Sequence, residues 1–288
     1  MDMNHKKYAI CNDEYFGKRL NLYAPFDDEI LSVIKQNDIK SVLLNCSFGW
    51  PAGSIDFLEE IKGVKGIYLY DNLIQDLTPL EYLSDLEVVY LECPKVKKSC
   101  RFDFFDNLKD LRVDWRACFS SLFNCSHLET LVVNNFAAED LGQFCVSESL
   151  TRLDIIKSKI ISVDGIGNLR KLKSLCLYGC SKLLDISAVS QLDLERIEIK
   201  SCKKVEKLDP IFSISSIEEV DLDGCGAFSS DRNLKNLRSL KLLNLGDVYF
   251  EDGELHELPR LDGVDVWLKN KKHYSHSFNQ LTRNFLKK

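Results

Sequence analysis

Two neighbouring stretches share one pattern: LKSLCLYGCSKL at residues 172–183 and LERIEIKSCKKV at residues 194–205. Each has apolar side chains at its first, fourth and sixth positions and a cysteine at its ninth. The frame L-x-x-L-x-L, in which L stands for any apolar residue, begins at eleven positions that lie 20 to 25 residues apart. These positions are Ile39, Val64, Leu86, Leu108, Leu128, Leu150, Leu172, Leu194, Ile217, Leu237 and Leu261. A recurring frame of this length indicates a repeat architecture.

A single coil of this pattern cannot bury its own apolar residues. The alternating L-x-L part predicts a strand with one buried face. The apolar residues Leu77, Leu80 and Leu83 fall at helix-like spacing and form the opposite wall of a coil. Stacked coils bury both walls against their neighbours, so the sequence predicts an α/β solenoid with a parallel sheet.

The repeats resemble the leucine-rich repeat family. Besides the two stretches above, VKGIYLYDNLI at residues 64–74 is a good copy. The segment NLIQDLTPLEYLSDLEVVYL at residues 72–91 is similar to the short, 22-residue internalin-like or phosphatase-regulator-like repeat. The resemblance covers residues 39–268 and implies a right-handed leucine-rich repeat solenoid of about eleven repeats, with the parallel sheet on its concave face. It says almost nothing about function, because function depends on sites that a fold carries.

Each coil must turn after its strand, and the turn leaves backbone N–H and C=O groups inside. The family places Asn, Cys, Ser or Thr there to bond them. Here that position holds Asn72, Ser158, Cys180, Cys202 and Cys225. A metal site built on the three cysteines is the alternative interpretation. Because coils stack about 4.8 Å apart, the thiols form a ladder rather than a tetrahedral cluster, and we expect a structural role.

The first end of the solenoid needs a cover, because terminal coils expose apolar edges. We assign residues 1–38 to an N-terminal cap. We expect a strand near residues 18–24 and a helix that begins after Asp27, a residue type suited to capping.

The last segment, residues 269–288, is a basic C-terminal cap or tail. It places Phe278, Leu281 and Phe285 on one helical stripe and carries a charge of +6. Since the whole chain carries −6, the rest of the chain carries −12. Binding to nucleic acid or to an acidic lipid is one interpretation of such a segment, and a solvated end is the more usual one.

The third, fifth and seventh positions of each frame point away from the core, onto the outer face of the sheet. Aromatic and apolar side chains gather there in neighbouring coils. We predict a partner-binding strip made of Tyr68, Tyr70, Val88, Tyr90 and Trp115. Exposed tyrosine and tryptophan often carry the binding energy of protein interfaces. Tyrosine also fits an ordinary exposed strand, which is the alternative interpretation.

An acidic cluster two coils wide follows further along the same face. Its members are Glu198, Glu219, Asp221 and Asp223. Like charges at this spacing repel one another, so a basic partner would relieve the repulsion and be steered towards the cluster. Acidic side chains that simply keep the repeats in solution are the alternative.

The sequence gives little support for catalysis or metal binding. Cys125 and His127 could pair as a nucleophile and its base, but they fall in a connecting loop without a third residue to orient them. His273 and His276 offer two metal ligands without a third. We therefore predict a protein that is not an enzyme and has no metal or other cofactor.

Composition favours the cytoplasm. The 288 residues include eleven cysteines and no apolar run suited to a signal peptide or a membrane span. These features indicate reduced thiols, and the net charge of −6 argues against a nucleic-acid partner. We predict a monomeric protein-binding scaffold without membrane contact, and an inhibitor or immunity-type protein for a basic enzyme or toxin is the more specific hypothesis. The alternatives are a regulatory subunit of a cytosolic enzyme such as a phosphatase, or a bacterial effector delivered to host cells.

Overall fold

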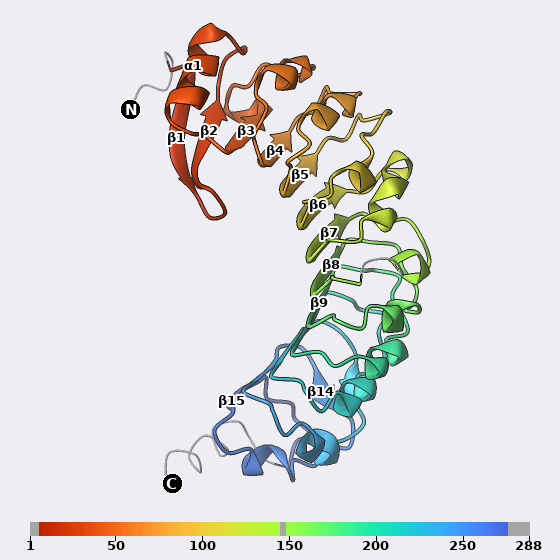
Figure 1. Ribbon diagram of the computed structural model, residues 1–288. Coiled ribbons are helices and arrows are strands. Elements are labelled where there is room, and N and C mark those ends of the chain that lie inside the picture. The colour runs from red at the N-terminus through yellow and green to blue at the C-terminus, as the bar shows by residue number, and fades with distance from the viewer. Residues whose placement is uncertain (1–5, 145–147, 276–288) are drawn as a thin grey trace. The chain divides into compact units, whose positions relative to one another are not determined.

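The computed structural model (Figure 1) describes residues 6–144 and 148–275. Its contacts divide the chain into two compact units, residues 1–133 and 134–288. Each unit consists of right-handed coils with one short strand on one side and, in most coils, a 3-10 turn on the other. Among the described residues, no helix has the length and apolar content that crossing a bilayer requires.

The first unit begins with a hairpin and a helix and continues as single-strand coils. Its strands and its α-helix are β1 (Tyr8–Asp13), β2 (Gly17–Leu22), α1 (Asp28–Gln36), β3 (Ser41–Asn45), β4 (Gly66–Tyr70), β5 (Val88–Glu92), β6 (Asp110–Asp114) and β7 (Thr130–Asn134). Its 3-10 turns are η1 (Cys46–Phe48), η2 (Asp56–Glu60), η3 (Thr78–Tyr82), η4 (Phe102–Phe104) and η5 (Ala117–Asn124). The parallel strands pair in step, so residues at equivalent frame positions, such as Leu43, Tyr68 and Tyr90, lie side by side.

The N-terminal helix has the predicted cap. The carboxylate of Asp27 accepts the backbone N–H of Ile30 at 3.0 Å, and Ile30 and Ile34 are buried on the inner side of α1. The strand expected near residues 18–24 is β2, which pairs in parallel with β3. Strand β1 was not predicted, because its alternation is weak; it is held by antiparallel pairing with β2.

The second unit repeats the same coil with two extra short strands. Its strands are β8 (Arg152–Ile156), β9 (Ser174–Tyr178), β10 (Arg196–Lys200), β11 (Glu219–Asp223), β12 (Ala227–Phe228), β13 (Leu242–Leu245), β14 (Tyr249–Phe250) and β15 (Asp265–Leu268). Its 3-10 turns are η6 (Gly142–Phe144), η7 (Ile166–Asn168), η8 (Ser187–Gln191), η9 (Asp209–Ser213), η10 (Asp231–Asn236) and η11 (Leu258–Arg260). The main sheet follows the order β8-β9-β10-β11-β13-β15, and β12 pairs with β14 outside it.

The three cysteines predicted at the turn position bond the inner backbone as expected. The thiols of Cys180, Cys202 and Cys225 are buried and donate to the carbonyls of Ile155, Leu177 and Ile199, each at 3.5 Å. Every thiol therefore reaches the strand of the preceding coil, and the ladder links successive coils through their interior.

The prediction that Asn72 bonds the inner backbone at the turn after its strand is wrong. Asn72 is exposed, and the preceding residue, Asp71, is fully buried in its place. One carboxylate oxygen of Asp71 accepts the N–H groups of Leu73 at 2.7 Å and Ile74 at 2.9 Å, and the other accepts that of Gly53 at 3.1 Å. The coil turns one residue earlier than the frame suggests, so a stronger acceptor takes the inner position.

The predicted frames at Leu237 and Leu261 are also out of register. Strand β11 pairs Val220 with Leu243, which in turn pairs with Val266. The frames therefore start at Leu240 and Gly263, three and two residues later than predicted. The outward positions of β13 and β15 shift accordingly. The proposed helical stripe of Phe278, Leu281 and Phe285 lies outside the described residues.

Candidate protein-binding face

The predicted aromatic strip lies on the outer sheet face of the first unit, but this face is covered. Only 4% of Tyr68, 3% of Val88 and 9% of Tyr90 is exposed. These three side chains pack together with Leu43, and Tyr70 packs partly buried against them. The exposure that we predicted for Tyr68, Val88 and Tyr90 is therefore wrong.

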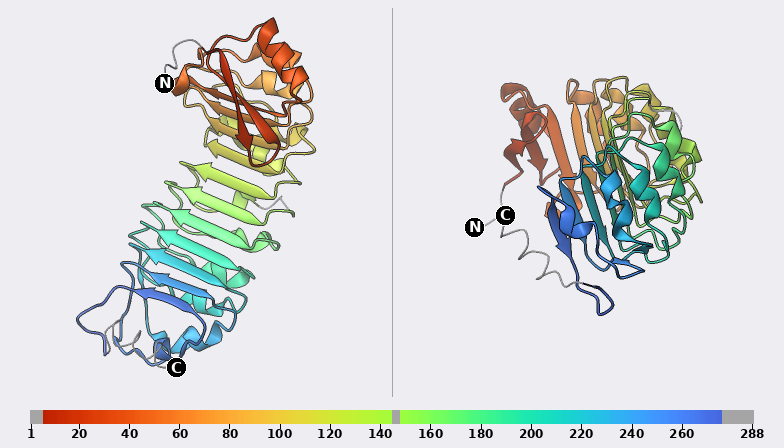
Figure 2. Two further views of the ribbon diagram at one scale, coloured as in Figure 1. Left: turned by 90° about the vertical axis from the view of Figure 1, so that its left-hand side faces the viewer. Right: turned by 90° about the horizontal axis from the view of Figure 1, so that it is seen from below.

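The cover is the turn that connects β1 and β2, which lies across the neighbouring strands (Figure 2, left). The phenol oxygen of Tyr15 lies 2.8 Å from that of Tyr90 and donates to a carboxylate oxygen of Asp110 at 2.7 Å. The guanidinium of Arg112 sits 4.2 Å above the Tyr90 ring centroid and bonds Asp110 at 3.1 Å. Burial raises the pKa of Tyr90, so this phenol stays protonated and acts as a packed, hydrogen-bonded group.

Local sequence explains why the turn folds over this face. One oxygen of Asp13 accepts the N–H groups of Tyr15 and Phe16, both at 2.9 Å, and the other accepts the Ser41 hydroxyl at 3.0 Å. Gly17 completes the turn with φ of +78°. On the sheet, Gly66 leaves room for the turn, because a Cβ there would lie 2.6 Å from the Phe16 ring.

Trp115, the last member of the predicted strip, is partly buried just after β6. Its ring lies 5.4 Å from that of Phe123 in η5. Partner binding through the strip stays a prediction, and it would require this packing and the hairpin turn to rearrange.

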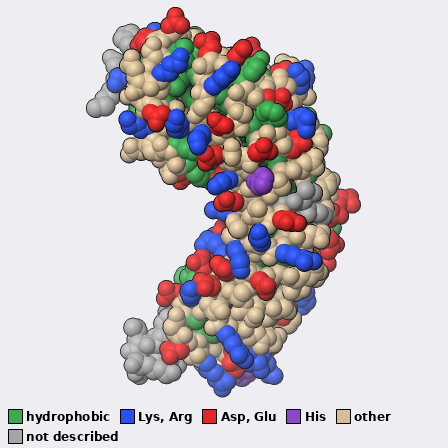
Figure 3. All heavy atoms as spheres, in the orientation of Figure 1, with side chains coloured by type: hydrophobic (Ala, Val, Ile, Leu, Met, Phe, Trp, Pro, Cys, Tyr) green, Lys and Arg blue, Asp and Glu red, His purple; other side chains and the backbone are tan. Residues whose placement is uncertain are grey.

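The predicted acidic cluster lies on β10 and β11, where two cations of the same face pair with three of its four carboxylates and neutralise half of its charge. Arg196 bonds Glu219 and also Glu198, the latter at 3.3 Å. Lys200 lies 2.6 Å from Asp221 and 3.0 Å from Glu198. Burial opposes ionisation of Glu198, but the bonds from Lys200 and Arg196 outweigh it and hold its pKa below the usual value. Figure 3 likewise shows acidic and basic side chains interspersed over the visible side of the second unit.

A groove with an uncharged floor lies next to these ion pairs, and we call it the β13 groove. Its floor is the outward side of β13 and the residue after it: Leu242, Asn244 and Gly246. Asp223 stands on one side, and Trp267 of β15, which pairs with Asn244, stands on the other. The groove encloses about 790 Å³, and 51% of Trp267 is exposed.

Gly246 keeps the groove open at one end. A Cβ at this position would lie 2.3 Å from Oδ1 of Asp223. That oxygen accepts the N–H of Asp247 at 2.8 Å, so Asp223 closes the chain turn while its side chain stays exposed. Lys271 and Lys269 hold the carboxylate of Asp247 at 2.7 Å and 3.4 Å and keep its pKa low.

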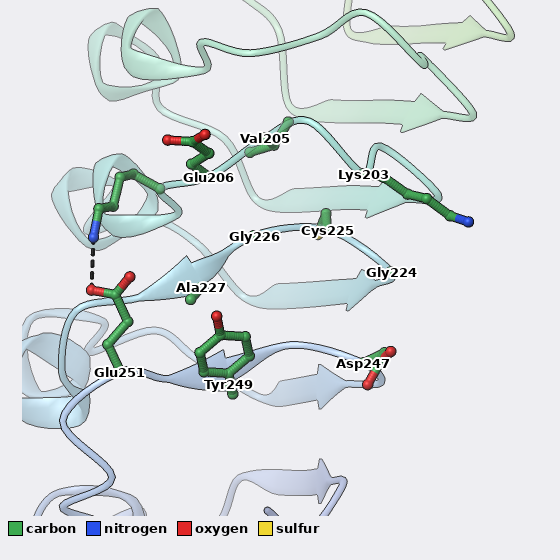
Figure 4. A pocket seen from close by; sticks show the side chains of 11 residues that line it. Lys203, Val205, Glu206, Gly224, Cys225, Gly226, Ala227, Asp247, Tyr249 and Glu251 are labelled. Carbon is green, nitrogen blue, oxygen red and sulfur yellow. Dashed lines mark hydrogen bonds and ion pairs between the residues drawn. The ribbon is translucent and has the colours of Figure 1, made fainter.

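A second groove of about 590 Å³ lies where the loops after β11 and β13 are short (Figure 4). The chain needs five residues from Leu222 to Ala227, but eight over the equivalent path from Ile199 to Lys207. An ion pair of 2.7 Å between Lys207 and Glu251 spans one end. Its lining mixes both charges and does not indicate a particular ligand.

The candidate catalytic cysteine has no reactive environment. Only 6% of Cys125 is exposed, and burial raises its pKa to about 12. Its thiol lies 3.8 Å from the Ser121 carbonyl. Within residues 6–144 and 148–275, no group of three or more His, Cys, Asp or Glu side chains is placed to hold a metal ion.

Sequence reasoning missed Trp267 as a site residue. The frame assigned at Leu237 turned Leu242 into the coil, so the uncharged outward positions of β13 were not recognised beside Trp267. Aligning the frame on Leu240 would have placed an outward-pointing tryptophan next to three uncharged positions.

Comparisons with known proteins agree on the architecture. No family model matches the chain. A leucine-rich repeat protein of Leptospira interrogans superposes with a TM-score of 0.58 over 84% of this chain and 66% of that chain, at 18% identity. An internalin of Listeria monocytogenes superposes with a TM-score of 0.50 over 82% of this chain and 69% of that chain, at 17% identity. The chain has the leucine-rich repeat fold.

Similarity in sequence to curated proteins is local. A candidate adenylate cyclase regulatory protein of Trypanosoma equiperdum is 31% identical to this chain over 124 residues. The match covers 41% of this chain, and the chain spans only 19% of the length of that relative.

Proposed function

We propose that this leucine-rich repeat protein is a non-enzymatic scaffold that captures a protein partner on the outer sheet face of its second unit. The observation that carries the proposal is Trp267, a large aromatic side chain that is half exposed beside the β13 groove. Tyr178, 42% exposed on β9, adds a second aromatic group to the same face. Aromatic anchors on a rigid strand, bordered by charged pairs, are typical of interface hot spots.

The first unit is a weaker candidate for this contact. Tyr68 and Tyr90 would have to lose the hairpin turn before a partner could reach them. Their packing is therefore best explained as part of the folded core. Glu219 and Asp223 retain a place at the proposed contact because both lie on the outward side of β11, Glu219 partly buried at its start and Asp223 exposed at its end.

The partner that suits this face is a basic protein. The chain carries −6 overall, and such a charge speeds encounter with a positive surface. We infer a cytoplasmic inhibitor or immunity-type role in which the scaffold blocks a basic enzyme or toxin stoichiometrically. A regulatory subunit of a cytosolic enzyme is the second candidate, and the local similarity to a regulatory protein favours it.

Capture from an extract of the native cells tests the proposal. Trp267→Ser should abolish recovery of the partner. Leu184→Ser is the matched control, because Leu184 is 50% exposed in the same unit but lies outside the sheet. Recovery that survives Trp267→Ser, or that is lost equally in both variants, would show that the sheet face is not the binding surface.

A further inference from the structure

We propose that the β13 groove is a slot for an arginine side chain of the partner, an inference that rests on the proposed function. Trp267 and Asp223 both line the groove, and they lie on β15 and β11, the two strands that flank β13. A planar guanidinium can stack on an exposed indole and bond a carboxylate at its edge. Lysine cannot do both with one planar group.

Charge pairing on this face leaves Asp223 available. The two lysines that line the groove are already engaged, Lys200 with Asp221 at 2.6 Å and Lys269 with Asp247 at 3.4 Å. Asp223 uses Oδ1 to accept the N–H of Asp247 at 2.8 Å. In the described part of the chain no cation pairs with Asp223, so its Oδ2 can receive a partner's charge.

The whole face has the matching charge. From β10 to the residues after β15 it carries six carboxylates, Glu198, Glu219, Asp221, Asp223, Asp247 and Asp265. Four cations oppose them, Arg196, Lys200, Lys269 and Lys271. The surplus of two negative charges lies on the β10 and β11 side, next to Asp223, and this is where an arginine would place its positive charge.

The dimensions also suit an extended segment. Strands β11 and β15 flank β13, and neighbouring strands lie about 4.8 Å apart, so the groove is about 10 Å from side to side. An extended chain fits this width. On the floor of the groove, Leu242 offers an apolar contact to the partner residue next to the arginine.

A defined peptide tests the slot without knowledge of the partner. The probe is acetyl-Gly-Ser-Leu-Gly-Arg-Gly-Leu-Ser-Gly-amide, compared with the same peptide carrying citrulline, the uncharged analogue of arginine. Binding to the full chain is followed through the indole N–H signal of Trp267 in ¹⁵N NMR spectra. We expect the arginine peptide to bind at least fivefold more tightly than the citrulline peptide.

Asp223→Asn should remove this preference, since an amide keeps an oxygen for the Asp247 N–H but loses the charge. Asp85→Asn, which changes an exposed carboxylate in the first unit, should leave it intact. Equal binding of the two peptides, no binding of either, or a Trp267 signal that shifts with protein concentration alone would overturn the arginine slot. The proposed function is tested by a different experiment: it fails if partner capture survives Trp267→Ser.

Discussion

Replacing Gly66 by alanine tests whether the hairpin turn covers the sheet face of the first unit. The new Cβ would lie 2.6 Å from Cε2 of Phe16 and 2.9 Å from Cβ of Ser41. Overpacking of this kind costs about 1–3 kcal/mol. Alanine regains about 0.5–1 kcal/mol, because glycine loses more backbone entropy when a strand forms. We expect Gly66→Ala to destabilise the protein by about 1 kcal/mol.

The second half of the test is Phe16→Ala. Phe16 is partly buried, so we expect roughly half of the 3–5 kcal/mol that a fully buried phenylalanine loses, about 2 kcal/mol. In the double variant, the alanine at position 66 occupies space that the ring has vacated, and only the contact with Ser41 remains. The double variant should cost about 2 kcal/mol rather than about 3, a coupling of about 1 kcal/mol.

Hydrogen exchange of the hairpin amides measures these free energies locally, which suits a protein with two compact units. Phe48→Ala combined with Gly66→Ala is the control. Phe48 is 58% exposed in the same unit, and its effect should simply add. If Phe16 and Gly66 also behaved additively, the turn would not rest on the sheet, and our explanation for the buried tyrosines would be refuted.

Three further predictions concern the coils and their ion pairs. Asp71→Ala leaves three N–H groups without their acceptor, so urea unfolding should show a loss of about 3–5 kcal/mol in stability. Asp71→Asn keeps the oxygen that Leu73 and Ile74 share, so its loss should be only about 1–2 kcal/mol. Iodoacetamide at pH 7.5 should leave Cys125 unmodified in the native protein while it labels the partly exposed Cys46, as mass spectrometry would show. Because the pKa of Glu198 is lowered from 4.5, its stabilising effect is present above pH 4.5 and is lost as the pH falls further. The urea midpoints of wild type and Glu198→Gln should therefore differ at pH 7, and the difference should shrink as the pH falls below 4.5.

The interior of the coils could be predicted because its chemistry is local. An apolar residue every few positions and a cysteine at the turn are sufficient to place Leu175, Leu177 and Cys180 inside. The Asp71 turn shows the limit of this reasoning. Both Asp71 and Asn72 can accept backbone N–H groups, and only the tighter turn selects the aspartate.

The register near the C-terminus was ambiguous for a different reason. The run LRSLKLLNL at residues 237–245 satisfies the frame from either Leu237 or Leu240. Pairing with β11 selects the second, and pairing is a contact between coils that a single frame does not contain. Trp267 was missed as a consequence, since its importance depends on the uncharged residues of the neighbouring strand.

The covered tyrosines show a third limit. The frame correctly points Tyr68 and Tyr90 out of the coil interior, onto the outer face of the sheet. Their burial arises from Tyr15, which bonds Asp110, 95 positions later in the chain. Periodicity within a repeat carries no information about such a contact, so the sequence predicted the direction of these side chains but not their exposure.

Site-specific photocrosslinking tests the proposed binding face most directly. A benzoylphenylalanine placed at Trp267 should form a covalent adduct with the partner in living cells, and one placed at the equally exposed Leu184 should not. Adducts formed from position 184 and not from position 267 would place the partner away from the sheet and contradict the central claim.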